Sequence, residues 1–222
     1  MGMMQPANRF SFDHANHAGP ALESRADELR DRLSLVPPNL LVERTGAPYL
    51  EVGQGRGEFH FAFFDSQVIL TYPEFTLATA SGDPLASIKR ALLVYYFVTA
   101  DGIRPGGEWT SFADLPEGRV YATAFQGYSG NELAKTFGLD IASFQAACEK
   151  LGGILSPYGD ASYRFRALPH FDMLVVYHLG DDDFPSSCNI LFDATAGHYL
   201  PTEACAVIGS MLTRKIIWHK SH

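Results

Sequence analysis

The spacing of hydrophobic residues changes along the chain between the period of a helix and the period of a strand. The first helical run has apolar residues spaced four, three and four positions apart, so they share one face. Pro20, a favoured first-turn residue, opens this run, and Pro37-Pro38 ends it. Further helices are predicted over 84–99 behind the cap Asp83, 129–138 behind a capping box at Ser129, 140–151 behind Asp140, and 203–216 behind Thr202.

Strands are predicted where short apolar, aromatic and β-branched runs are bounded by turn residues. Two hairpins stand out, one over residues 59–72 with a turn at Asp65-Ser66, and one over 189–200. The segment 173–178 is apolar enough to be a central strand. The full set of expected strands is 40–42, 49–52, 59–64, 67–72, 120–125, 163–166, 173–178, 189–192 and 198–200.

Two segments of the chain resemble each other. Residues 63–74 and 191–203 each contain a Phe-Asp pair, then a Pro and a Glu, and an apolar helix follows. We interpret them as two related ββα units that pack into one core, although two ordinary hairpins could match by chance. The predicted class is therefore α+β, a mainly antiparallel sheet packed with helices. Residues 1–18 are expected to be loose and 19–222 to form one domain, with helix 84–99 more buried than helix 203–216.

Composition restricts the classes of partner. The formal net charge is −8, and the 17 Lys and Arg residues are scattered, which disfavours nucleic acid and an anionic membrane surface. The partner is therefore expected to be a small molecule or a protein. The longest apolar run, residues 91–100, is too short to span a bilayer, and no signal peptide is recognised. Three cysteines without a close pair favour core thiols in a reducing, cytoplasmic compartment.

Three motifs suggest chemistry but have simpler structural explanations. Gly127-Tyr-Ser-Gly-Asn131 departs from a nucleophile elbow, because Asn131 replaces the second glycine that the elbow needs. Ser129 is instead explained as a helix cap. The glycines of segment 53–57 precede a strand, so they indicate a turn rather than a phosphate cradle. The acidic run 181–183 is typical of a solvated loop.

The candidate ligand-binding residues are Asp101, Trp109, Tyr128 and His178. Residues 100–112 form a glycine-rich loop with a lone Trp109, and aromatic side chains on loops favour flat ligands. His178 ends the apolar strand and could titrate near neutral pH. We expect Trp109, Tyr128 and His178 near a groove between the two ββα units. Trp109 could also simply cover one edge of the core, and His178 could be structural.

A metal site is the weaker alternative. Asp193, His198 and Glu203 offer two carboxylates and an imidazole within a short stretch, a set that could hold a divalent cation. Turn and cap positions explain the two acids equally well, since Asp193 is at a hairpin corner and Glu203 at a helix start. No metal is favoured.

The combined pattern of the chain also resembles a known family. The pieces include Ala100-Asp-Gly102, Trp109-Thr-Ser-Phe112, Asp183-Phe-Pro185, Leu191-Phe-Asp193 and Tyr199-Leu-Pro-Thr-Glu203. Together they resemble an uncharacterised domain-of-unknown-function family of anaerobic bacteria and archaea. The resemblance implies an association of some relatives with iron–sulfur or corrinoid proteins, but this chain lacks a cysteine cluster, and no catalytic residue carries over.

Three functions remain open from the sequence. The first is an accessory protein that binds a flat or anionic small molecule, with a tetrapyrrole-type cofactor as one example. The second is a metal-assisted hydrolase that uses Asp193, His198 and Glu203. The third is a protein-interaction domain without catalysis. The cofactor and the oligomeric state are not predicted.

Overall fold

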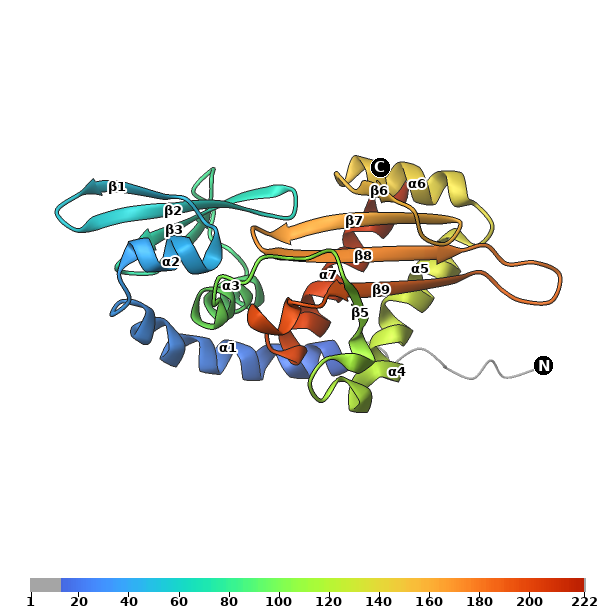
Figure 1. The fold of residues 1–222 in the computed structure, drawn as a ribbon, viewed down its shortest axis with the longest axis horizontal. Coiled ribbons are helices and arrows are strands. Elements are labelled where there is room, and N and C mark those ends of the chain that lie inside the picture. Colours follow the sequence, from blue (N-terminus) through green and yellow to red (C-terminus); the bar gives the residue numbers. More distant parts are fainter. Residues whose placement is uncertain (1–12, 222) are drawn as a thin grey trace, which may run out of the picture.

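The computed structural model describes residues 13–221, with side chains from Leu22 onward except at position 27. These residues form two antiparallel sheets, of four and five strands, packed with helices (Figure 1), which confirms the predicted α+β class. Residues 1–12 of the segment expected to be loose lie outside the described residues. Residues 13–18 already belong to helix α1 (Asp13–Leu33), so the predicted start at Pro20 is wrong.

The four-stranded sheet is a meander in which each strand pairs with the next one along the chain. Alternation along the second strand turns Phe59, Phe61 and Phe63 to one buried face, which packs against helix α3 through Phe97. The predicted hairpin over residues 59–72 is confirmed. The strands are β1 (Tyr49–Gly53), β2 (Arg56–Phe63), β3 (Ser66–Tyr72) and β4 (Leu77–Thr79), and α3 spans Ser87–Thr99.

The five-stranded sheet has the order β5-β9-β8-β7-β6, so the strand nearest the N-terminus joins at one edge. Strand β8 is central and buried along nearly its whole length, as its apolar sequence predicts. The strands are β5 (Trp109–Ser111), β6 (Ile154–Ser156), β7 (Ala161–Leu168), β8 (Phe171–His178) and β9 (Ser187–Asp193).

In residues 13–221, helices pack against one face of the five-stranded sheet and not against the other (Figure 1). Phe192 of β9 and Tyr177 of β8 lie on this helical face, where they contact Phe125 and Phe144. The opposite face, which we call the open face, is crossed near one end by the segment 100–108. The helices are α4 (Gly118–Tyr128), α5 (Gly130–Phe137), α6 (Ile141–Lys150) and α7 (Thr202–Ser221), with 3₁₀ turns at Phe112–Asp114 and Ala196–His198, and α2 spans Pro38–Thr45.

Three predicted strands are wrong. Residues 40–42 lie in α2, and residues 120–125 lie in α4. Residue 198 ends a 3₁₀ turn, and residues 199–200 follow it outside any strand. Pro38 starts α2 at a first-turn position, a role that outweighs the local apolar run. Gly118 starts α4, and Phe125 then packs on the sheet rather than joining it.

The ββα repeat is not observed. Asp65 lies at the β2–β3 turn of the four-stranded sheet, whereas Asp193 ends β9 of the five-stranded sheet, whose partners are β8 and β5. Because residues 198–200 do not pair back on β9, the second unit lacks its hairpin. The two segments share letters without sharing a structure, and the groove expected between two such units is not formed.

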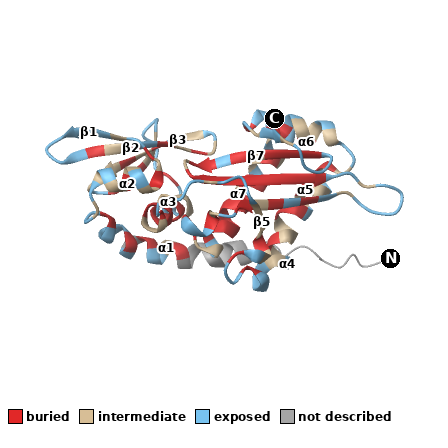
Figure 2. Ribbon diagram, viewed as in Figure 1, coloured by how far each residue is buried: buried red, intermediate tan, exposed pale blue. Residues whose placement is uncertain are grey.

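Helix α7 is as central as α3, contrary to the expected order of burial. Its residues 204–210 are all buried, as are residues 91–97 of α3 (Figure 2). Small residues explain this, because they let α7 approach the neighbouring aromatic rings closely. A Cβ atom at Gly209 would lie 2.7 Å from the Phe125 ring. The expected wet face is confined to the later turns, where Arg214 is exposed.

One continuous cluster of buried side chains runs through both sheets. Tyr96 of α3 and Tyr199 after the last 3₁₀ turn stack with ring centroids 5.5 Å apart, which joins the two halves. The three cysteines are all free and buried, as expected for core thiols. In the part of the chain that the structure describes, no helix is both long and apolar enough to cross a bilayer.

Candidate functional site

The segment 100–108 is fixed to the open face by a buried carboxylate. Asp193 at the end of β9 accepts a hydrogen bond from the backbone N–H of Gly107 at 2.7 Å. Its other oxygen accepts from the backbone N–H and the hydroxyl of Thr195, at 3.0 and 2.7 Å. With both oxygens engaged, Asp193 holds the loop in place, and its residue type at a strand end is explained by that role.

Asp101 and His198 form a pair at the start of this segment. The His198 Nδ1 lies 2.6 Å from the Asp101 Oδ2, while Asp101 Oδ1 accepts from the N–H of Ile103 at 3.1 Å. Burial acts to raise the pKa of the Asp101 carboxyl, but the hydrogen bond from His198 and the one from Ile103 outweigh it and hold that pKa below its usual range. Both side chains are about 45% exposed, so the imidazole is accessible to solvent.

A buried network lies beneath this pair. The Tyr96 hydroxyl donates to the Thr45 carbonyl at 2.6 Å and accepts from the His170 N–H at 3.0 Å. The Tyr199 hydroxyl donates to the Ile103 carbonyl and lies 3.3 Å from the His170 Nδ1. Burial, assisted by the Asp101 charge, raises the pKa of Tyr199 to about 12. The network ties the segment 100–108, α2 and the β7–β8 turn together.

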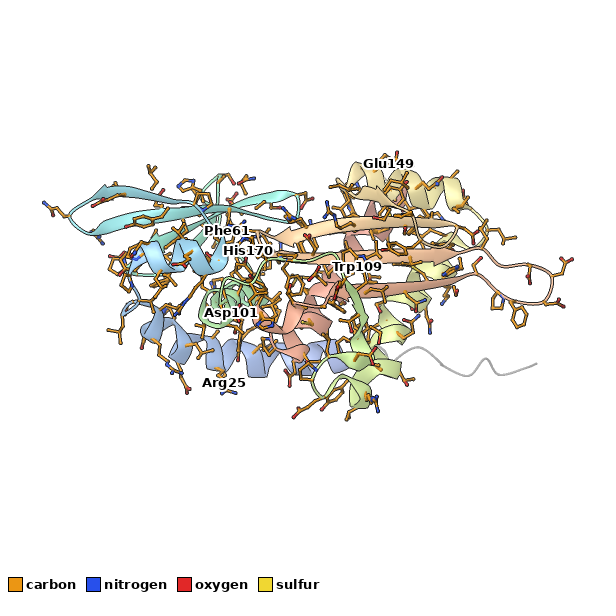
Figure 3. All side chains as sticks on the ribbon, in the orientation of Figure 1. Arg25, Phe61, Asp101, Trp109, Glu149 and His170 are labelled. Atoms are coloured by element: carbon orange, nitrogen blue, oxygen red, sulfur yellow. The ribbon has the colours of Figure 1, made fainter. Side chains whose placement is uncertain are left out.

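His170 is positioned as a structural residue rather than as a free base. Burial, and then the charge of Arg104, lower the pKa of its imidazole. The ring contacts Tyr199 on one side, and the Arg44 backbone adds a hydrogen bond. Gly46 makes room for it, since a Cβ atom there would lie 2.5 Å from the His170 Nε2. Figure 3 shows His170 close to Asp101 at the end of the sheet.

The open face carries two arginines around one carboxylate. Arg166 of β7 holds Asp172 of β8 in a bidentate pair, with contacts of 2.9 and 3.1 Å. Arg164, two residues earlier and on the same face, lies 3.7 Å from the same carboxylate. Asp172 is only 3% exposed while the arginines are 58% and 37% exposed, so their free N–H groups reach solvent.

Trp109 shares this face with the arginines. It is paired with Asp193 across β5 and β9, and side chains of directly paired residues point to the same side of a sheet. Leu191 and Leu174 lie between β5 and Arg164, in one row across the sheet. Trp109 is half-buried, and three strand spacings, about 14 Å, separate β5 from β7.

The four predicted ligand-binding residues are not gathered in one place. Asp101 and Trp109 lie at two ends of the segment that crosses the open face (Figure 3). Tyr128 lies on the helical face instead, where its ring meets the edge of Phe125, and burial raises its pKa to about 12. His178 shares the open face but ends β8, roughly 20 Å along the strand from the row of Asp172.

The alternative metal ligands are also separated by their contacts. Both carboxylate oxygens of Asp193 accept hydrogen bonds from Gly107 and Thr195. His198 contacts Asp101, and Glu203 is exposed in the first turn of α7. Among the described residues, no three His, Cys, Asp or Glu side chains come close enough together to hold a metal ion. The arrangement therefore gives no support to the metal-assisted reading.

The remaining motifs have structural roles. Ser129 is buried between α4 and α5, and its hydroxyl donates to the Phe125 carbonyl at 2.5 Å rather than capping α5, so the predicted capping box is wrong. Asp140 does cap α6, through the N–H of Ser143. Segment 53–57 is a hairpin turn, and the Asp181 carboxylate accepts from two N–H groups of its own loop.

Several residues of this region were missed by sequence reasoning. One signal was present, because Asp172 interrupts an otherwise apolar strand, and a charge in such a strand needs a partner. The charges at Arg164 and Arg166 alternate with buried residues and so predict one face of β7. His170 carried no signal, since its role depends on a glycine and two tyrosines far away in the chain.

Residues 38–215 match the model of a family described as a domain of unknown function, DUF3786. No curated protein and no solved structure matches the chain. The family carries no assigned chemistry, so the function has to be inferred from the residues described above.

Proposed function

We propose that this chain, which belongs to the DUF3786 family, binds a small molecule that combines a flat apolar part with an anionic group. The observation that carries the proposal is the open face, where Trp109 of β5 and Arg164 of β7 lie on the same side of the sheet. The row of Arg164 reaches β5 at Ser111, two residues from Trp109. Sites for small molecules are mostly apolar and have a few convergent polar groups. On the open face Trp109 and Leu191 are half-buried and supply the apolar contacts, and the arginines supply the polar ones, while Leu174 is buried.

Trp109 supplies a surface for the flat part. An indole ring prefers offset stacking on other planar groups, and each such contact contributes about 0.5–1.5 kcal/mol beyond the area that it buries. The Asp193 carboxylate holds the backbone N–H of Gly107, two residues before Trp109, so the ring belongs to a fixed backbone. A fixed platform loses less entropy on binding than a mobile one.

The arginines supply the contact with the anion. Asp172 accepts two hydrogen bonds from the guanidinium group of Arg166. Arg164 is 3.7 Å from the same carboxylate, which is too far for a hydrogen bond. Arg164 therefore retains N–H donors for a ligand. Guanidinium groups pair with carboxylates and phosphates in a two-pronged geometry, which favours these anions.

A complete tetrapyrrole fits these residues less well than a smaller planar anion. A macrocycle of that kind is held between two apolar walls and by an axial ligand, whereas Trp109 and Leu191 offer one wall. The family resemblance implies that some relatives are associated with corrinoid proteins, and haem is therefore still a useful probe. The three cysteines are buried, and among the described residues they do not come together with other metal-binding side chains. They therefore do not fit an iron–sulfur cluster.

Binding can be tested with three probes that separate the two features. Flavin mononucleotide is flat and anionic, riboflavin is flat and neutral, and inorganic phosphate is anionic only. We expect the first to bind at least about tenfold more tightly than either of the others in calorimetric titration, because it alone can contact both Trp109 and Arg164. Haem is the fourth arm, and binding of haem alone would favour the tetrapyrrole reading.

Variants locate the binding. Trp109→Leu should weaken flavin mononucleotide by about 2- to 10-fold and Arg164→Gln by about fivefold or more. Trp218→Leu and Arg119→Gln, which remove an exposed Trp and an exposed Arg elsewhere, are the matched controls. Equal affinity for all three probes, or equal losses in the controls, would refute the proposal.

The Asp101–His198 pair favours a second candidate function, proton transfer. A carboxylate that orients one imidazole nitrogen leaves the other available as a general base. Screening with p-nitrophenyl esters and phosphates tests this, and the activity should be lost in His198→Gln and unaffected by chelator. Sensitivity to chelator would instead restore the metal-assisted alternative, and activity that survives His198→Gln would exclude this pair.

A further inference from the structure

A second candidate site lies at the other end of the molecule, between α2 and the buried face of the four-stranded sheet. A cleft of about 640 Å³ opens there beside the β1–β2 hairpin, which extends past α2 at one end of the molecule (Figure 1). The residues that line it are Pro38, Asn39, Val42, Tyr49, Glu51, Gly55 and Tyr72.

A missing side chain decides where the Tyr49 ring lies at the edge of the cleft. Glu51, Gly57 and Tyr72 form one row across β1, β2 and β3, so they share the face toward α2. Gly57 in the middle of the row has no side chain, which leaves space for a neighbouring ring. The ring of Tyr49 leans into the space, and a Cβ atom at position 57 would lie 2.4 Å from its hydroxyl oxygen.

Two aromatic rings meet at the cleft almost at right angles. The ring centroids of Tyr49 and Tyr72 are 6.1 Å apart with an interplanar angle of 87°. Phe75 and Phe59 support them from behind, with centroids 5.6 Å from Tyr72 and 4.9 Å from Tyr49. Perpendicular rings with rigid support are the arrangement that presents more than one electron-rich face to a cation.

The charge of the cleft has the sign that suits a cation. Glu51 is its one charged lining residue, and no basic side chain lines it. Glu51 lies two residues from Tyr49 on the same face of β1, and burial and then the Glu51 carboxylate raise the pKa of the Tyr49 hydroxyl. The nearest basic residue on the hairpin, Arg56, lies on the other face of the sheet and is paired with Glu74.

We propose that this cleft binds a compact organic cation, a quaternary or alkylated ammonium group, between the rings of Tyr49 and Tyr72 with Glu51 as its counter-ion. Aromatic faces attract such cations through the ring quadrupole, and the alkyl groups pack on the same rings. Asn39 adds a polar amide for a hydroxyl or carbonyl attached to the cation. This site is independent of the one proposed on the open face.

The probe pair is choline and 3,3-dimethylbutan-1-ol, which have the same shape but differ in charge. Titration of the full chain, followed by NMR of the tyrosine ring protons, should show choline binding about 5-fold or more tightly than the alcohol. Equal affinity would overturn the proposal, because recognition would then be by shape alone. Failure of choline to bind at tens of millimolar would also overturn it.

Variants distinguish the contribution of the Tyr72 ring from that of its hydroxyl, and the contribution of the Glu51 carboxylate from that of the net charge. Tyr72→Phe should keep choline affinity within about twofold, Tyr72→Leu should weaken it about 2- to 30-fold, and Glu51→Gln about fivefold. Glu58→Gln, on the outer face of the same sheet and paired with His60, is the matched control. If Tyr72→Leu does not fold, the choline affinities of Glu51→Gln and Glu58→Gln are compared instead. Equal losses of choline affinity in these two variants contradict the assignment.

Discussion

Tyr96→Phe is the change that tests most sharply how the two halves of the molecule are joined. The hydroxyl of Tyr96 is fully buried and makes two hydrogen bonds, to the Thr45 carbonyl at 2.6 Å and from the His170 N–H at 3.0 Å. Phenylalanine keeps the ring, and with it the stacking on Tyr199, and removes only the oxygen. The change therefore isolates the polar link.

The magnitude follows from the two groups that lose their partner. Each hydrogen bond contributes about 0.5–1.5 kcal/mol net, and a buried group left unpaired costs about 1–3 kcal/mol. Thr45 and His170 are both buried, so neither group gains water in exchange. We expect the free energy of unfolding to fall by about 2–4 kcal/mol. For a chain of this size that corresponds to roughly 5–15 °C in the melting temperature.

Urea denaturation followed by circular dichroism measures this loss, and Tyr121→Phe is the matched control. Tyr121 is half exposed on α4, so its variant should stay within about 0.5 kcal/mol of the wild type. A loss below about 0.5 kcal/mol for Tyr96→Phe would show that the two bonds do not stabilise the junction, and the reasoning would fail.

Three further predictions follow from single contacts. Gly46→Ala should destabilise the chain by more than about 1 kcal/mol in urea denaturation, because φ is +69° and the new methyl group meets the His170 ring. Gly127→Ala should stabilise it by about 0.5–1 kcal/mol in the same assay, because position 127 is inside a helix and a Cβ atom there has no neighbour within 4 Å. The hydrogen bond from the Ser143 N–H lowers the pKa of Asp140, so the stabilisation that it gives is present above the unfolded pKa of about 3.9 and is lost as pH falls through the lower folded pKa. Asp140→Asn should remove this part of the pH dependence, between about pH 5 and about pH 2, in thermal melts. An unchanged pH profile of the melting temperature would contradict the prediction. Burial raises the pKa of all three thiols, so a thiol reagent should label none in the native protein and all three in denaturant, and labelling of the native protein would contradict their burial.

Local sequence signals predicted the secondary structure correctly where no second signal in the same segment favoured a different element. Asp140 capped its helix, and the alternation of residues 59–72 gave the first hairpin. They failed where a start signal competed with an apolar run, as at Pro38 and Gly118. The ββα repeat failed for another reason, since strand pairing depends on partners far away in the chain, and β9 pairs with β5 and β8.

The candidate sites were only partly predictable. Trp109 was found because a lone aromatic residue in a glycine-rich loop is conspicuous, and Asp101 because it opens the same loop. Their surroundings depend on strand register, which places Arg164 on the face of Trp109. They also depend on helix packing, because α4 carries Tyr128 on the opposite side of the sheet. The aromatic cleft likewise depends on Gly57 lying between Glu51 and Tyr72, a row that becomes visible only once the three strands are paired.

The most direct test of the open face is the indole N–H resonance of Trp109 in a ¹⁵N-labelled Trp218→Phe protein, where this signal comes from one residue. During titration with flavin mononucleotide, the resonance should shift along a saturating curve whose midpoint matches the calorimetric affinity. Arg164→Gln should move that midpoint to a higher concentration by about fivefold or more. An indole resonance that stays fixed while calorimetry shows saturation would place the ligand elsewhere and contradict the proposed site.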